Sequence, residues 1–149
     1  MSKSIDDNIE YLVGKSGNYL TKRRKNILDV QEVSLVSNAV VLTEDMTGSV
    51  VLLPDSSANT DVITLPATPA NGTNFKLLFG TDLTASFVMA GAFEGGGTVA
   101  GDYFDLAAAA SITFTGTKVK AGDYMTCVYI SGKWYCEGVG TLATAFATA

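Results

Sequence analysis

The fold class is decided by the stretch Tyr124-Met125-Thr126-Cys127-Val128-Tyr129-Ile130, then Ser131-Gly132, then Lys133-Trp134-Tyr135-Cys136-Glu137. β-branched and aromatic residues dominate both runs, as they do in strands. Ser-Gly is a composition typical of a two-residue hairpin turn. Such a turn places Ile130 opposite Lys133, Tyr129 opposite Trp134, Val128 opposite Tyr135 and Cys127 opposite Cys136. The stretch therefore predicts an antiparallel hairpin with Tyr129, Trp134 and both cysteines on one face.

Similar short apolar runs, separated by Gly, Pro, Asn, Asp and Ser clusters, precede this hairpin along the chain. They predict further strands at 38–43, 48–53, 61–65, 74–79, 85–90, 111–115 and 117–120. This number and spacing are typical of a β-sandwich or a jelly roll. No gap between the runs offers the helical crossover of an α/β fold. We therefore expect one all-β body over residues 29–149.

Three other segments of the body are predicted from their composition. Glu94-Gly95-Gly96-Gly97-Thr98 indicates a flexible loop. The segment 106–110 is either a single helical turn or a packed loop. The Thr/Ala-rich tail from Thr141 has Leu142 and Phe146 spaced for one strand face, and it could pair with a neighbouring subunit.

Residues 1–28 contain too few apolar groups for a core, so we predict an N-terminal arm. Ser4 and Asp7 resemble a capping box, and apolar residues follow at helical spacing, which predicts a short helix over 5–13. A basic run then occupies 22–25. The net charge is +3 over residues 1–25 and −8 over residues 26–149. A basic arm on an acidic body indicates electrostatic docking onto a negatively charged surface.

Several segments together resemble a pattern of β-rich virion proteins of tailed bacteriophages. They are Val41-Leu42-Thr43-Glu44-Asp45, Gly48-Ser49-Val50-Val51, Val62-Ile63-Thr64-Leu65-Pro66, Gly72 before Phe75-Lys76-Leu77-Leu78-Phe79, Gly122-Asp123-Tyr124 and Gly132-Lys133-Trp134-Tyr135. In that pattern a strand ending in Thr-Leu-Pro leads through a Gly turn to an aromatic strand, and a final hairpin carries Gly-x-Trp-Tyr. The resemblance covers about residues 40–138.

The small size and the lack of a repeated shaft favour the capsid decoration (cement) type within this resemblance. It implies a homotrimer on the capsid surface of the virion, assembled in the host cytoplasm, with the major capsid protein as partner. The arm would bind the capsid through Ile5, Ile9, Leu12, Tyr19, Lys22, Arg23, Arg24 and Lys25. The alternative is a fibre or collar adhesin that recognises a host-surface glycan with the Tyr/Trp hairpin.

The chain contains no histidine, which removes the usual general base, the usual zinc ligand and any Ser-His-Asp arrangement. We expect no enzyme activity, no cofactor and no metal site. Two acidic pairs, Asp102 with Asp105 and Glu44 with Asp45, are the nearest candidates for acid–base chemistry, but such pairs more often lie solvated on loops. The Gly95–Gly97 run lacks the following Lys-Ser/Thr of a phosphate-binding loop.

The remaining candidates concern thiols, nucleic acid and membranes. Cys127 and Cys136 pack as reduced, apolar side chains in a reducing cytosol, with a cross-strand disulfide formed after lysis as the alternative. The basic run at 22–25 is short and has no aromatic platform beside it, which argues against nucleic acid as the partner. No stretch reaches the roughly 18 apolar residues of a membrane helix, and no membrane partner is expected.

Overall fold

The computed structural model describes residues 29–149, in which the regular secondary structure is β-strand apart from one 3-10 turn, and this confirms the prediction of an all-β body. Its strands are β1 (Val30–Glu32), β2 (Ala39–Val41), β3 (Ser49–Leu53), β4 (Asp61–Thr64), β5 (Asn74–Phe79), β6 (Phe87–Val99), β7 (Asp102–Asp105), β8 (Ala109–Phe114), β9 (Tyr124–Ile130), β10 (Lys133–Gly140) and β11 (Phe146–Thr148). A 3-10 helix, η2 (Glu44–Met46), follows β2. The helix expected over 5–13 lies outside the described residues.

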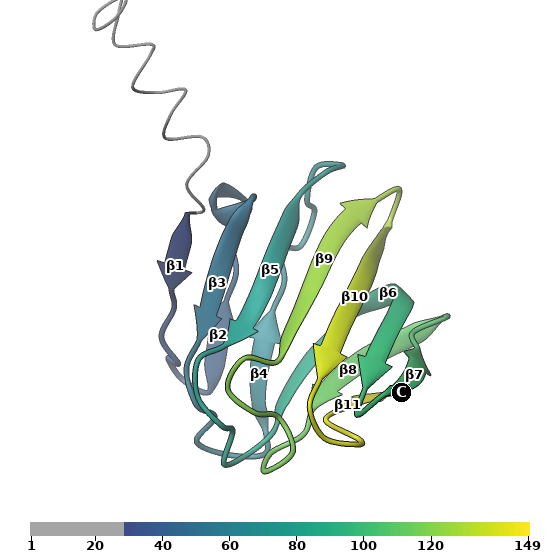
Figure 1. Cartoon of the computed structure of the whole chain (residues 1–149). Helices are drawn as coiled ribbons and strands as arrows, with labels where there is room; N and C mark the ends of the chain where they lie inside the picture. The colour runs from purple at the N-terminus through teal and green to yellow at the C-terminus, as the bar shows by residue number, and fades with distance from the viewer. Residues whose placement is uncertain (1–28) are drawn as a thin grey trace, which may run out of the picture.

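The strands form one sheet that folds over into two layers (Figure 1). β1, β3, β5, β9 and β10 form the front layer, whereas β2, β4, β8 and β11 lie behind them in the back layer. The long strand β6 belongs to both. Its residues 87–89 pair with β4, and its residues 93–99 pair with β10. A shift of register between Ala90 and Phe93 marks the passage from one layer to the other.

The first half of the chain winds around the body with parallel pairing. β1, β3 and β5 are parallel neighbours in the front layer, and β2, β4 and β6 are parallel neighbours in the back layer. Parallel strands require a crossover connection. Here each crossover is a strand of the opposite layer, so no helix is needed. The jelly-roll form is not confirmed, because a jelly roll consists of antiparallel strands.

The predicted hairpin is confirmed in its full register. β9 and β10 pair antiparallel, with Ile130 opposite Lys133, Tyr129 opposite Trp134 and Cys127 opposite Cys136. Ser131 and Gly132 have φ values of 49° and 91°. Positive φ at both central residues is the requirement of a type I′ turn, whose twist matches that of the strands.

A single aromatic and aliphatic core fills the space between the layers. Phe79 of the front layer lies 5.1 Å from Phe114 of the back layer, measured between ring centroids. Phe114 in turn packs edge-on against Phe146 of β11. Leu77, Phe87 and Met89 are fully buried in the same cluster. Burial of this apolar surface is the main stabilising term of the body.

The prediction of a flexible loop at Glu94–Thr98 is wrong, because these residues form the second half of β6. The glycines are required there by close backbone packing. A Cβ built on Gly97 would lie 2.0 Å from the carbonyl oxygen of Gly138 in β10, and one on Gly95 would lie 2.0 Å from that of Cys136. Glycine is found in strands where another backbone approaches closely.

The strand predicted at 117–120 is also wrong. Residues 116–118 form a turn in which Thr117 has a positive φ of 67°, and the Val119 N–H donates to the Thr115 carbonyl at 3.0 Å. Val119 is nevertheless fully buried. Its apolar side chain produced the strand-like pattern, although it fills the core from a loop.

The C-terminal tail pairs within its own chain through β11, and its pairing with a neighbouring subunit stays a prediction. Phe146 of β11 lies opposite Phe114 of β8. Leu142 precedes the strand and does not share its face. Between β7 and β8, residues 107–108 form a turn, and neither β1 nor β7 had been predicted.

Candidate functional site

Among residues 29–149, the outward face of the back layer carries no charged side chain. Register partners across five strands form one row, Ala39, Val62, Val88, Thr113 and Ala147. The same face also holds Val41, Thr64, Ala90 and Ser111. Val41 is 54% exposed and Val62 is 37% exposed. We call these nine residues the back face. Six of the nine are Val or Ala and three are Thr or Ser, so the face is uncharged and largely apolar but also carries hydroxyl groups.

The outward face of the front layer differs in chemistry. Lys76 of β5 and Thr126 of β9 are neighbours in one row, and Glu137 of β10 follows Thr126. The Lys76 ammonium lies 4.3 Å from the centre of the Tyr124 ring. Lys133 forms an ion pair with Glu94, and the hydrogen bond in this pair raises the pKa of Lys133. The same face also carries Leu52, Leu78, Tyr135 and Val139, so it mixes charged side chains with apolar ones.

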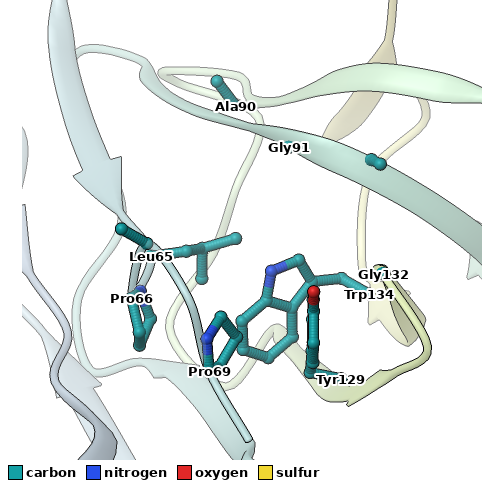
Figure 2. Close-up of a pocket in the computed structure, with 10 residues that line it drawn as sticks. Leu65, Pro66, Pro69, Ala90, Gly91, Tyr129, Gly132 and Trp134 are labelled. Carbon is teal, nitrogen blue, oxygen red and sulfur yellow. The ribbon is translucent and has the colours of Figure 1, made fainter. Parts of the chain in front are cut away.

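A pocket of about 280 Å³ opens beside the point where β6 changes layers. β4 pairs with β6 only up to Met89, and β10 begins to pair with it only at Phe93. Gly91 and Ala92 lie between these two pairings without a register partner. The pocket occupies the resulting gap. Its wall is completed by Leu65, Pro66 and Pro69 from the segment that follows β4 (Figure 2).

Two polar aromatic groups from the hairpin line this pocket. Tyr129 and Trp134 pack edge to face with ring centroids 5.2 Å apart, and Phe75 stacks on Trp134 at 5.7 Å. Figure 2 shows the indole nitrogen of Trp134 and the hydroxyl of Tyr129 directed toward the space beneath Gly91. Trp134 is only 4% exposed. Within residues 29–149 Asp61 Oδ1 is the one buried side-chain polar atom without a hydrogen-bond partner, so the Trp134 and Tyr129 donors are not orphaned in the core and are open to the pocket.

The acidic pairs singled out from the sequence are separated from one another by the fold. Asp102 and Asp105 lie at opposite ends of β7 and are both exposed, and the Asp105 carboxylate accepts a hydrogen bond from the Ala107 N–H. Glu44 accepts a bond from the Ala70 N–H at 2.8 Å, whereas Asp45 accepts one from the Thr43 hydroxyl. Asp105, Glu44 and Asp45 thus bond to nearby loop residues, and the two pairs do not form one acid–base site.

Asp61 is a fully buried carboxylate that the sequence did not single out. Its Oδ2 accepts hydrogen bonds from the Ser57 N–H at 2.7 Å and the Ala58 N–H at 3.0 Å, and the hydroxyls of Ser56 and Ser57 also donate to it. Burial favours the neutral acid, but these four bonds together outweigh burial and lower the pKa of Asp61. Its role is to anchor the loop that precedes β4.

The two cysteines are free thiols in this structure, and both are buried. The Cys136 thiol donates to the sulfur of Cys127 at 2.9 Å. This contact, together with burial, raises the pKa of Cys127 well above its usual range. Both side chains are buried and pack as small apolar groups of the core.

The residues predicted to bind the capsid, Ile5, Ile9, Leu12, Tyr19, Lys22, Arg23, Arg24 and Lys25, lie outside the described residues. In the part of the chain that the structure describes, no three His, Cys, Asp or Glu side chains gather in a way that could hold a metal ion. Residues 29–149 also include no helix with the length and apolarity needed to cross a membrane.

Comparison with protein-family models gave no match for the chain, and comparison with curated proteins gave none either.

Sequence reasoning found the hairpin residues of the pocket but missed its other wall. The Thr-Leu-Pro end of the predicted strand at 61–65 was a usable signal, because proline stops pairing and turns the chain away from the sheet. The back face could also have been found from the sequence. Val62 and Thr64, like Val88 and Ala90, alternate with buried residues but are not charged, as solvated strand residues often are.

Proposed function

We propose that this protein is a structural subunit of a tailed-phage particle, a capsid decoration subunit that binds the assembled head and stabilises it. The observation that carries the proposal is the distribution of charge. Residues 1–25 have a net charge of +3, residues 26–149 have a net charge of −8, and the acidic body has one broad face without charge. A basic arm and a broad uncharged face both suit contact with large protein surfaces better than binding of a small substrate.

The basic arm supplies the contact with the major capsid protein. Lys22, Arg23, Arg24 and Lys25 would attract an acidic capsid surface, and such attraction raises the association rate and falls with added salt. The apolar residues at 5, 9 and 12 would supply a part that does not depend on salt. A subunit that binds only the assembled shell stabilises that shell by mass action.

The back face supplies the contact between copies of the chain. Two bodies of net charge −8 repel one another, and the repulsion is weakest where the back face has no charge. Its side chains are small or β-branched, so a neighbouring surface can approach closely. In the homotrimer that we propose, three β-sandwich bodies would turn their back faces toward the threefold axis.

The proposal is tested by co-sedimentation of the full-length protein with phage heads that lack it. We expect saturable binding that weakens as salt shortens the Debye length below about 10 Å, its value near 0.1 M. A variant with Lys22, Arg23, Arg24 and Lys25 all changed to Gln should bind much more weakly. Lys118→Gln, which removes one exposed charge from a body turn, is the matched control and should bind normally.

Two results would contradict the proposal. Failure of the unmodified protein to bind heads at any salt concentration would exclude a decoration role. Normal binding by the variant without the four basic residues would show that the arm is not the electrostatic anchor.

A further inference from the structure

We propose that the pocket between β4, β6 and β10 is a binding site for one ring of an uncharged saccharide. This inference goes beyond the capsid role, because the pocket lies in the β body and uses none of the basic residues of the arm. It rests on four properties of the pocket: its charge, its hydrogen-bond donors, its apolar wall and its size.

The lining excludes a charged ligand. Among residues 29–149, none of those that line the pocket is Asp, Glu, Lys or Arg. A charged ligand would lose its hydration here without gaining an opposite charge, and that loss is costly. An uncharged ligand with several hydroxyl groups has no such penalty.

The two donors can be met by acceptors on a ligand. The indole N–H of Trp134 and the hydroxyl of Tyr129 face the pocket (Figure 2), and within residues 29–149 neither is a buried polar atom without a partner, so both are accessible from the pocket. Trp134 is only 4% exposed, so its ring is held in a fixed orientation. A sugar hydroxyl can accept from such a donor, and it can also donate a bond of its own.

The wall and the size indicate a single ring. Leu65, Pro66 and Pro69 present an apolar surface opposite the donors, which suits the C–H face of a pyranose (Figure 2). The volume of about 280 Å³ is close to the lower limit of roughly 300 Å³ for small-molecule pockets. Gly91 and Ala92 of β6 line the pocket at the point where the strand has no register partner.

The chain provides its own reporter for this site. Trp134 is the only tryptophan in the sequence, and its indole lines the pocket. We would titrate the full-length protein with glucose, galactose, N-acetylglucosamine and methyl mannoside, and follow the emission of Trp134. Glucuronic acid serves as the charged probe and a polyproline peptide as the extended one. We expect a saturable change with at least one neutral sugar and a weaker response to glucuronic acid.

Two substitutions locate the site. Tyr129→Phe keeps the ring but removes the hydroxyl, and it should weaken binding by about tenfold, the factor expected for one lost hydrogen bond. Tyr135→Phe is the matched control, because Tyr135 lies next to Trp134 in β10 but is 40% exposed and faces away from the pocket. Thermal unfolding of both variants checks that the body is intact.

Each contrary outcome overturns the inference. If none of the neutral sugars changes the emission, the pocket is not a saccharide site. If only polyproline binds, the pocket recognises a peptide. Equal loss of affinity in both tyrosine variants would place the sugar elsewhere. None of these results depends on binding to phage heads, so failure here leaves the capsid role to its own test.

Discussion

The two halves of β6 differ in what keeps them in the sheet: side-chain packing in the first half and close backbone approach in the second. In residues 87–90, Phe87 and Met89 point into the core and are fully buried, while Val88 and Ala90 point outward. In residues 94–98 the chain has three successive glycines, and their backbone lies directly between β10 and β7. The first half is stabilised by packing of its side chains in the core. In the second half the glycines have no side chains, and the backbones of β6, β7 and β10 can therefore lie close together.

This difference shows that one strand can be specified in two ways, and it yields predictions in a definite order of size. Substitutions in the second half should act through backbone clashes. Substitutions in the first half should act through lost packing, and those that point outward should scarcely affect stability.

Gly97→Val should have the largest effect. Its Cβ would meet the Gly138 carbonyl oxygen at 2.0 Å, so the pairing of β6 with β10 would have to open. We expect a loss above about 4 kcal/mol, the range reached only by exceptional substitutions. Chemical denaturation measures it. Gly101→Ala is the control, because Gly101 has open space around it and a φ of 95°, and it should cost only about 1–2 kcal/mol. Equal losses of stability in the two variants would show that a backbone clash at Gly97 is not the cause.

Phe87→Ala should come next, with a loss of about 3–5 kcal/mol. Phe87 is fully buried and lies opposite Phe114 in β8, so its removal leaves a cavity between the layers. Urea unfolding curves with an unchanged slope would confirm a packing effect. A shift below about 1 kcal/mol would show that the first half of β6 does not depend on its side chains.

Trp134→Ala should destabilise the body by about 3 kcal/mol, the lower end of the range for large aromatic residues. Trp134 faces Phe93 across the β10–β6 pair and stacks on Phe75, but one edge lines the pocket, so part of its surface is not packed against protein. The midpoint of thermal unfolding reports the change. A midpoint that barely moves would mean that the indole contributes to binding and not to the core.

Asp61 lies beside Phe87 across the β4–β6 pair, and it should make the first half of β6 sensitive to acid. Because its pKa is lowered in the folded protein, its contribution to stability is present above the usual aspartate pKa of about 4 and is lost as the pH falls below it. Unfolding measured between neutral pH and acid should show this loss, and Asp61→Asn should reduce it. An unchanged acid dependence in Asp61→Asn would assign the effect to other carboxylates.

Val88→Lys should have the smallest effect on stability, within about 0.5 kcal/mol, because the side chain points outward. Its effect on self-association should be large, since it places a charge in the middle of the back face. Light scattering compares it with Thr98→Lys, an outward and exposed position in the second half of β6. If both variants keep the oligomeric state of the unmodified protein, copies do not meet through the back face.

The same contrast explains what could be predicted from the sequence. The strand predicted at 85–90 contains an alternation of buried and outward residues, and the hairpin at 124–137 gave its register through a two-residue turn. The triple glycine has no side-chain pattern, so the sequence predicts a loop where the structure has a strand. Val119 has the opposite effect: it is a buried apolar residue after a turn, and its neighbourhood therefore predicts a strand that the structure does not have.

The parallel pairing and the pocket were beyond sequence reasoning for a different reason. Which strands become neighbours depends on contacts between residues far apart in the chain, such as Val30 with Val50 and Val50 with Lys76. Periodicity within a strand contains no information about its partner. Likewise, the wall of the pocket at 65–69 meets Trp134 only because β4 and β10 border the same strand.

The continuity of β6 through both layers has a consequence for cooperativity. Opening of the back layer would release residues 87–90, and opening of the front layer would release residues 93–99 of the same strand. Neither layer can therefore fray alone as an independent unit. In native-state hydrogen exchange, slowly exchanging amides of β4 and β10 should share one opening free energy, equal to that of global unfolding.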